Sequence, residues 1–251
     1  MKSAKIISLL NQKGGVGKTT SSVSISHALS MKGYKVLLVD LDAQCNASES
    51  LGVNSSKVNV YSVLKGQEKL DFINASDNFY LLPASLDLAA FELEMSSEAG
   101  REYLLKEALE PVIAHLDFII IDCSPNLGLL TINALTASEY YICPVLPHHL
   151  SITGFSTLLE VVNKIKRRLN EKLKLAGIIM TQFNKHKVLH RETAEVIQSH
   201  FEDKLFSTTI PENISLAEAP TSKQSIMDYA PTSKGAIAYR QLTEEIINKL
   251  K

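Results

Sequence analysis

The chain has 251 residues, of which 45% are hydrophobic and 21% are charged, close to the averages for globular proteins. These values exclude a disordered, collagen-like or disulfide-rich protein. The net charge of −1 is unevenly spread: residues 1–150 hold 11 Lys or Arg against 16 Asp or Glu, and residues 151–251 hold 15 against 11. The basic excess of the second part permits an anionic partner without requiring one.

The sequence carries no mark of secretion or of a membrane span. Cys45, Cys123 and Cys143 are far apart and odd in number, so they predict neither a disulfide framework nor a CxxC metal site. The apolar run near the start covers only residues 6–10 and lacks a small-residue cleavage site, unlike a signal peptide. No stretch approaches the roughly 18 apolar residues of a spanning helix. We therefore expect a reducing, cytoplasmic environment.

Short apolar runs alternate along the chain with longer segments of helical period, which predicts a mostly parallel sheet. The predicted strands are residues 5–10, 35–40, 79–83, 117–122, 140–144, 175–181 and 205–210. The predicted helices are residues 18–32, 99–115, 127–137, 153–169, 189–201 and 234–250. No repeat, low-complexity linker or long charge block interrupts this order. We therefore expect residues 1–251 to form a single α/β domain, doubly wound, with helices on both faces of the sheet.

A glycine-rich segment, KGGVGKTT at 13–20, lies between the first predicted strand and the first predicted helix. Glycines let a loop turn tightly enough for its N–H groups to surround a phosphate, and the helix dipole adds attraction. In this pattern Lys18 reaches the outer phosphates and the Thr19 hydroxyl coordinates Mg²⁺. The usual motif, GxxxxGK(S/T), has its first glycine where this chain has Gln12. A glycine-rich turn without a ligand is the alternative, which the flanking strand and helix disfavour.

KGGVGKTT resembles the deviant Walker A motif of the ParA/MinD family of P-loop ATPases. The resemblance continues in VLLVDLDAQCN at 36–46, IIIDCSP at 119–125, IPEN at 210–213, LAEAP at 216–220, and SKGA with AY at 233–239. It covers nearly the whole chain and is strongest to the short, Soj-type chromosome-partitioning members. It implies a P-loop NTPase fold, hydrolysis of ATP, and ATP and Mg²⁺ as cofactors. Because the phosphate loop starts at residue 13, we expect no N-terminal DNA-reading domain of the kind that longer plasmid ParA proteins carry.

The resemblance assigns the phosphate loop a nucleotide-binding and catalytic role. In the family the lysine that corresponds to Lys13 reaches across a dimer interface to the partner's nucleotide, where a cation stabilises charge on the transferring phosphoryl group. A solvated loop lysine is the alternative. Lys18 is assigned with it to catalysis. The nucleotide contacts implied by the loop are Lys13, Gly14, Gly15, Val16, Gly17, Lys18, Thr19 and Thr20.

Three aspartates stand at the carboxyl ends of predicted strands: Asp40 and Asp122 end theirs, and Asp42 lies just past the second. The resemblance gives Asp42 the positioning of the attacking water, directly or through Mg²⁺; a turn or helix N-cap aspartate is the alternative. Asp40 either shares the Mg²⁺ shell or supports it. Asp122 is the Walker B carboxylate, expected to hold Mg²⁺ through water, with a buried capping aspartate as its alternative. The expected metal site is therefore Thr19, Asp42 and Asp122.

Base recognition rests on resemblance alone. The adenine is expected between the strand end at Met180 and the segment around Pro211 and Asn213, whose amide offers a donor and an acceptor. An ordinary turn asparagine is the alternative. His148 and His149 replace a glutamate and an aromatic usual in the family, and we expect no metal there because adjacent strand residues point to opposite faces.

Family members of this type bind duplex DNA without sequence preference as ATP-bound homodimers on the nucleoid, and a ParB-type partner stimulates their hydrolysis. Glu212 and Ser215 stand where many relatives have arginines, and a glutamate would repel phosphates. The basic candidates are Lys164, Lys166, Arg167, Arg168, Lys172, Lys174, Lys185, Lys187 and Arg191. For the cluster in 164–174, a solvated helix face is the alternative.

Two other functions compete with this interpretation. A MinD-like positioning ATPase would need a detachable amphipathic C-terminal helix; residues 236–251 are amphipathic but coincide with the last predicted helix of the domain. We therefore expect no stable membrane association. A metabolic P-loop enzyme that transfers phosphate to a small molecule is disfavoured by the LAEAP segment and by Lys13.

Overall fold

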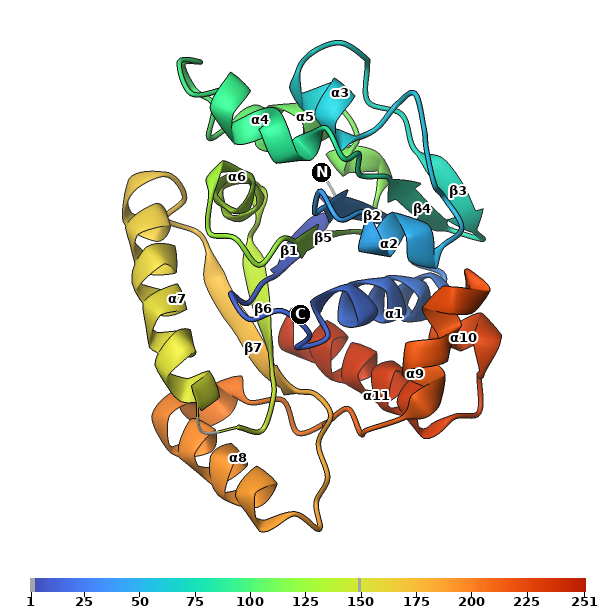
Figure 1. Cartoon of the computed structure of the whole chain (residues 1–251), viewed down its shortest axis with the longest axis vertical. Coiled ribbons are helices and arrows are strands. Elements are labelled where there is room, and N and C mark those ends of the chain that lie inside the picture. The colour runs from blue at the N-terminus through green and yellow to red at the C-terminus, as the bar shows by residue number, and fades with distance from the viewer. Residues whose placement is uncertain (1–2, 149) are drawn as a thin grey trace.

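The computed structural model describes residues 3–148 and 150–251, and within them it shows a seven-stranded sheet with helices on both faces (Figure 1). The sheet order is β3-β4-β2-β5-β1-β6-β7. Strand β3 pairs antiparallel with β4, and the other pairs are parallel. The strands are β1 (Lys5–Leu9), β2 (Val36–Leu41), β3 (Ile73–Ser76), β4 (Phe79–Leu82), β5 (Phe118–Cys123), β6 (Tyr140–Val145) and β7 (Lys174–Met180). The predicted doubly wound, mostly parallel sheet is confirmed.

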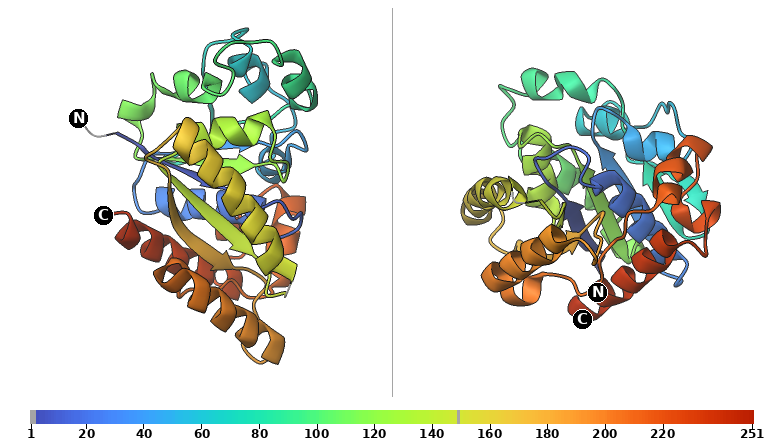
Figure 2. Two further views of the ribbon diagram at one scale, coloured as in Figure 1. Left: turned by 90° about the vertical axis from the view of Figure 1, so that its left-hand side faces the viewer. Right: turned by 60° about the horizontal axis from the view of Figure 1, so that its bottom comes forward.

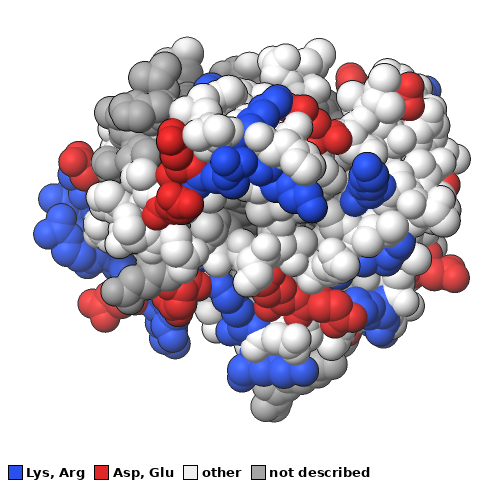
Figure 3. Space-filling model, turned by 90° about the horizontal axis from the view of Figure 1, so that it is seen from below, with Lys and Arg blue, Asp and Glu red and all other residues white. Residues whose placement is uncertain are grey.

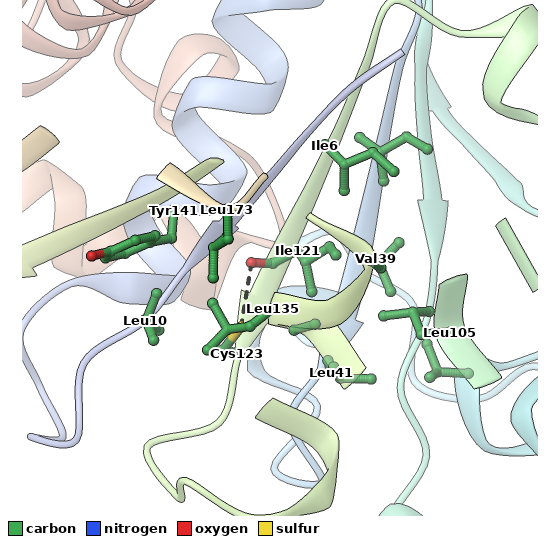
Figure 4. Packing of buried hydrophobic residues seen from close by; sticks show 14 of the residues in the cluster. Ile6, Leu10, Val39, Leu41, Leu105, Ile121, Cys123, Leu135, Tyr141 and Leu173 are labelled. Atoms are coloured by element: carbon green, nitrogen blue, oxygen red, sulfur yellow. Dashed lines mark hydrogen bonds between the residues drawn. The ribbon is translucent and has the colours of Figure 1, made fainter. Parts of the chain in front are cut away.

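The hydrophobic core forms two layers because successive strand residues point to opposite faces. Ile6 and Ile119 belong to one buried cluster, whereas their neighbours Ile7 and Ile120 belong to the other. Figure 4 shows the first layer, in which strand residues such as Ile121 pack with Leu135 of a covering helix. Both faces of the central strands are apolar, as expected for a sheet covered on both sides.

Helices from different parts of the chain cover the two faces. The first face carries α3 (Val60–Leu64), α4 (Leu88–Glu94), α5 (Leu104–Leu109), α6 (Leu129–Ala137), α7 (Leu150–Arg168) and α8 (Val188–Phe201). The second carries α1 (Lys18–Ser30), α2 (Asn46–Ser50), α9 (Ile214–Glu218), α10 (Ile226–Tyr229) and α11 (Lys234–Lys249). Short 3₁₀ helices are η1 (Ile113–His115), η2 (Glu202–Lys204) and η3 (Ala219–Ser222). Over the described chain, none of these helices combines the length and apolar character needed to cross a membrane.

One predicted strand is wrong. Residues 205–210 form only an isolated bridge, Leu205 with Ile178, beside β7. The carboxylate of Glu245 on α11 accepts the N–H groups of Ser207 and Thr208 at 2.8 and 3.0 Å. Because that side chain occupies these donors, they are unavailable for a strand ladder.

The predicted helix 99–115 is also wrong in extent. Gly100 adopts φ +73°, a left-handed conformation outside the helical range. Pro111 has no N–H and separates α5 from η1. The sequence interpretation also missed β3 and the short helices α2, α3, α4, α9 and α10. Each has at most seven residues, too few for a clear period.

Candidate functional site

A cavity of about 960 Å³ opens beyond the carboxyl ends of the central strands. Ligands of open parallel sheets bind where the strand order reverses. In this sheet β2 and β5 lie on one side of β1 and β6 lies on the other, so the order reverses at β1. At the opposite, amino end of β1, Lys5 Nζ donates to the carbonyl of Leu250, so the start of the sheet meets the end of the chain's last helix (Figure 2). The cavity walls come from the phosphate loop, the turn after β2, α4, the loop after β5 and the segment 216–226.

The phosphate loop is held in the shape that its glycines allow. Gly15 has φ +71° and Gly17, which begins α1, has φ +85°; side chains are strained in this region. The Thr181 hydroxyl, just after β7, donates to the carbonyl of Val16 at 2.8 Å. Gln182, at φ +50°, donates through Nε2 to the carbonyl of Gly15 at 3.3 Å. The loop is therefore tied to the segment that follows β7.

The two loop lysines differ in environment. Lys18 is 7% exposed, and its Nζ donates to the carbonyl of Lys13 at 3.4 Å. Burial lowers the pKa of Lys18, while Asp122 and then Asp42 act in the opposite direction. Lys13 itself is exposed, and its N–H is anchored on Asn11 Oδ1 at 3.0 Å. The buried lysine thus faces inward while the other stands at the surface.

Asp122 is fully buried at the end of β5. Its Oδ1 accepts the hydroxyl of Ser22 at 2.9 Å, whereas its Oδ2 is buried without a hydrogen-bond partner. Burial raises the pKa of Asp122 to about 7, helped by the charge of Asp40 and opposed by the nearby hydroxyls of Thr19 and Ser22. A buried carboxylate oxygen without a partner is costly unless it meets water or a cation. Carboxylate and hydroxyl oxygens are ligands that Mg²⁺ prefers, so these residues fit a magnesium site.

Asp40 lies within β2 and Asp42 directly follows that strand, and the two side chains have different environments. Asp40 is wholly buried, and its Oδ2 accepts both the N–H and the hydroxyl of Ser48 at 2.8 and 2.7 Å. Burial raises the pKa of Asp40 to about 6. Asp42 lines the cavity, and its Oδ1 accepts the N–H of Gln44 at 3.0 Å. Asp40 is therefore a support for α2, while Asp42 combines a turn contact with a place in the cavity wall.

The residues assigned to adenine are not brought together in the cavity wall. The side chain of Met180 is fully buried in the core and does not line the cavity. The carbonyl of Met180 accepts the N–H of Ile210. Pro211 bridges to Phe183. Asn213 has a buried Oδ1 without a partner. The walls instead include residues that the sequence interpretation missed: Gln182, Leu216, Ala219, Pro220, Thr221, Gln224, Ser225 and Ile226. The LAEAP segment was the available signal for part of this wall.

In the part of the chain that the structure describes, no group of three or more His, Cys, Asp or Glu side chains is placed to hold a metal ion. The His148 ring lies 6.3 Å from that of His190. His190 Nδ1 accepts the N–H of Asn184 at 3.0 Å, which ties it to the loop after β7. His149 lies outside the described residues.

Basic and acidic side chains are interspersed on the face seen in Figure 3. On the exposed surface, Lys187 Nζ lies 2.8 Å from Glu212 Oε1, and Lys187 lowers the pKa of Glu212. The carboxylate expected to repel DNA is therefore compensated by a neighbouring cation. On the end of α7, Lys164, Lys166 and Arg167 share a shallow surface depression with Glu160 and Glu171.

Comparisons with known proteins agree on one family. A family model described as an AAA domain matches residues 4–175. The sporulation initiation inhibitor protein Soj of Bacillus subtilis is 42% identical over 247 residues, covering 96% of this chain and 98% of that protein. The chromosome-partitioning ATPase Soj of Thermus thermophilus is 39% identical, covering 98% and 96%. The structure of cobyrinic acid a,c-diamide synthase from Mycobacterium smegmatis, with ADP and magnesium, matches with a TM-score of 0.86 at 33% identity, covering 98% and 95%.

Proposed function

This chain belongs to the ParA/Soj family of P-loop ATPases, and from that premise we propose that it is an ATP-driven switch in DNA partitioning, with residues 1–251 acting as one ATPase domain. It is an ATPase whose cofactors are ATP and Mg²⁺. The observation that carries the proposal is the convergence of Lys18, Asp42 and Asp122 from the ends of three adjacent parallel strands.

In this proposal the loop N–H groups and Lys18 bind the phosphates. Thr19, Asp42 and Asp122 hold Mg²⁺, and the unpartnered Oδ2 of Asp122 supports this assignment. The metal ion neutralises charge on the phosphate oxygens. Asp42 orients the attacking water from its place in the cavity wall. Asn213, through its unpartnered Oδ1, remains the candidate contact to the base.

We further propose that ATP joins two copies of the chain. Lys13 is exposed at the mouth of the phosphate loop, where a side chain can reach a second subunit. A cation supplied in trans makes hydrolysis depend on dimerisation. The ATP dimer is proposed to bind duplex DNA through lysines and arginines on its surface, in the cytoplasm on the nucleoid, and to release it when a ParB-type partner stimulates hydrolysis.

The Lys187–Glu212 ion pair makes the DNA proposal specific. Phosphates compete with Glu212 for Lys187, so Glu212→Gln should free this cation and raise DNA affinity, by about threefold at low salt. The matched control is Glu195→Gln, on α8, the helix that begins directly after Lys187. The measurement is fluorescence anisotropy with a short duplex in ATP and Mg²⁺. Equal affinities for the two variants would contradict a role for this surface.

The whole proposal is tested by size-exclusion chromatography of Asp42→Ala, with ADP and then with ATP and Mg²⁺, with and without duplex DNA. We expect a monomer with ADP, a dimer with ATP, and co-elution of that dimer with DNA. A dimer that leaves DNA behind would remove the nucleoid as its cargo surface. A monomer in all conditions would remove the switch.

Two alternatives are weaker. A MinD-like function needs α11 to leave the domain, yet Tyr239, Leu242 and Ile246 of α11 are buried in the core beside α1. Cosedimentation with anionic liposomes tests it. A synthase function is suggested by the name of the mycobacterial structure, which is 33% identical in sequence. The two Soj proteins are more similar, at 42% and 39% identity. ATP turnover without any small-molecule acceptor distinguishes the two.

A further inference from the structure

A buried polar cluster joins the helix that begins at the phosphate loop to the far wall of the cavity, formed by residues 224–226. His27 on α1 is 6% exposed, and its Nδ1 lies 2.5 Å from the hydroxyl oxygen of Ser225. Ser225 is 1% exposed, lines the cavity and begins α10. The same Nδ1 lies 3.6 Å from Asp228 Oδ2, whose side chain is 54% exposed. Figure 1 shows α10 beside α1.

The composition suggests a catalytic Ser-His-Asp triad, but the geometry excludes one. A triad uses one ring nitrogen for the serine and the other for the aspartate, whereas here Nδ1 faces both. The Ser225 oxygen also accepts the N–H of Met227 at 3.1 Å, which makes it the cap of α10. The cluster is therefore structural: it holds α10 beside α1 and supplies no nucleophile.

The two segments that the cluster joins both line the cavity. Val23 and Ser24 of α1 line the cavity, and His27 follows them by one helical turn on the same side of the helix. Opposite stand Gln224, Ser225 and Ile226. The contact between His27 and Ser225 thus joins α1 directly to the segment 224–226 of the cavity lining.

We propose that His27 is a positioning residue for nucleotide binding, which holds the cavity wall formed by residues 224–226 against α1 through Ser225. The inference rests on the proposed nucleotide site. Because the Ser225 oxygen already accepts the Met227 N–H, its hydroxyl hydrogen is available to an unprotonated His27 Nδ1. In this proposal the neutral imidazole accepts that hydrogen and is the form that holds the wall.

Protonation works against this arrangement. Burial lowers the pKa of His27, and Asp228 on α10 acts in the opposite direction. Among the described residues, the ring of Phe79 of β4 lies tilted against that of His27 with centroids 5.5 Å apart, and Arg240 of α11 donates to the carbonyl of Pro231. Because the pKa of His27 is lowered where the ring is buried against Ser225, protonation of the ring weakens that contact. Nucleotide affinity should therefore fall as the pH falls below about 6.5, the ordinary pKa of histidine.

The experiment is calorimetric titration of the protein with ATP and Mg²⁺ between about pH 8 and about pH 5.5. His27→Asn keeps a hydrogen-bonding atom at the Nδ1 position but does not titrate. Asp40, Asp122 and the nucleotide phosphates titrate in both proteins, so the difference between the two profiles isolates His27. We expect wild type to lose about tenfold more affinity than His27→Asn over this range. His115→Asn, at an exposed histidine in η1, should behave as wild type.

Two further variants complete the test. Asp228→Asn removes the carboxylate that favours the protonated ring, so the loss of affinity should move to lower pH. At about pH 8, His27→Leu should bind about fivefold more weakly than wild type, with thermal unfolding as the check on folding. Identical profiles for wild type and His27→Asn, or wild-type affinity in His27→Leu, would overturn the inference. Absence of ATP binding by wild type at about pH 8 would instead overturn the nucleotide site itself, and the inference with it.

Discussion

The two ends of the cavity are built differently. At the phosphate end, Lys18, Asp42 and Asp122 follow the carboxyl ends of adjacent parallel strands, and each is less than a tenth exposed. The far wall consists of short helices that pack against α1, α2 and α11, and His27 with Ser225 is one of its polar contacts. The first end therefore rests on strands paired in the sheet, whereas the second rests on the packing of short helices. Substitutions at the phosphate end should therefore abolish function, and those at the far wall should tune it.

The largest effect is expected for Lys18→Ala. The buried cation is the proposed partner of the outer phosphates, and its loss leaves Asp122 without a compensating charge. ATP affinity should fall at least about 100-fold. Calorimetric titration measures it, with the exposed Lys69→Ala as control. Unchanged affinity would remove the assignment of the phosphate loop.

Asp42 comes next, and two substitutions separate its roles. Asp42→Asn keeps an acceptor for the N–H of Gln44 but loses the charge, whereas Asp42→Ala loses both. If the carboxylate positions the attacking water, both variants should hydrolyse ATP about 100-fold more slowly and accumulate the dimer. Phosphate release and size-exclusion chromatography measure these effects. Normal turnover in Asp42→Asn would leave Asp42 with its turn contact alone.

Lys13→Ala tests the exposed part of the phosphate end. Because its side chain stands at the surface, nucleotide affinity should stay within about threefold of wild type, while the ATP dimer is lost. Sedimentation velocity in the Asp42→Ala background, which prevents hydrolysis, is the measurement. Lys69→Ala in the same background is the control. A Lys13→Ala protein that still dimerises would argue against a role in trans.

The smallest effect is expected near the far wall. A Cβ on Gly235 would lie 2.8 Å from Leu216 Cγ, and Leu216 lines the cavity. Gly235→Ala should lower the free energy of unfolding by about 1–3 kcal/mol and weaken ATP binding by only about threefold, because the wall shifts. Denaturant unfolding and ATP titration measure the two effects. Adding Leu216→Ala removes the contact and should restore binding; no restoration would place the cause elsewhere.

The phosphate end could be predicted because its signals are local. The loop at 13–20 begins shortly after β1, and Asp40, Asp42 and Asp122 lie at the carboxyl ends of β2 and β5, so residues close in sequence predict the geometry. The metal site of Thr19, Asp42 and Asp122 stays a prediction, supported by the unpartnered Oδ2 of Asp122. The far wall could not be predicted in the same way, since His27 and Ser225 meet across 198 positions of the chain.

The errors have the same origin. Residues 205–210 are apolar enough for a strand, yet Glu245, on the last helix, accepts the N–H groups of Ser207 and Thr208. The repulsion of DNA phosphates by Glu212 stays a prediction from its charge, and only the fold places Lys187 beside it. In both cases a side chain distant in sequence determines what a local pattern does.

Sequence alone determined the alternation of apolar strands with helices, the phosphate loop and the carboxylates after the strands, because periodicity and short motifs depend on neighbouring residues. Tertiary structure decided which segments line the cavity. It also decided that Asp40 supports α2 while Asp42 lines the cavity, and that His27 of α1 contacts Ser225. These depend on contacts between distant segments, whose geometry is set when the helices pack on both faces of the sheet.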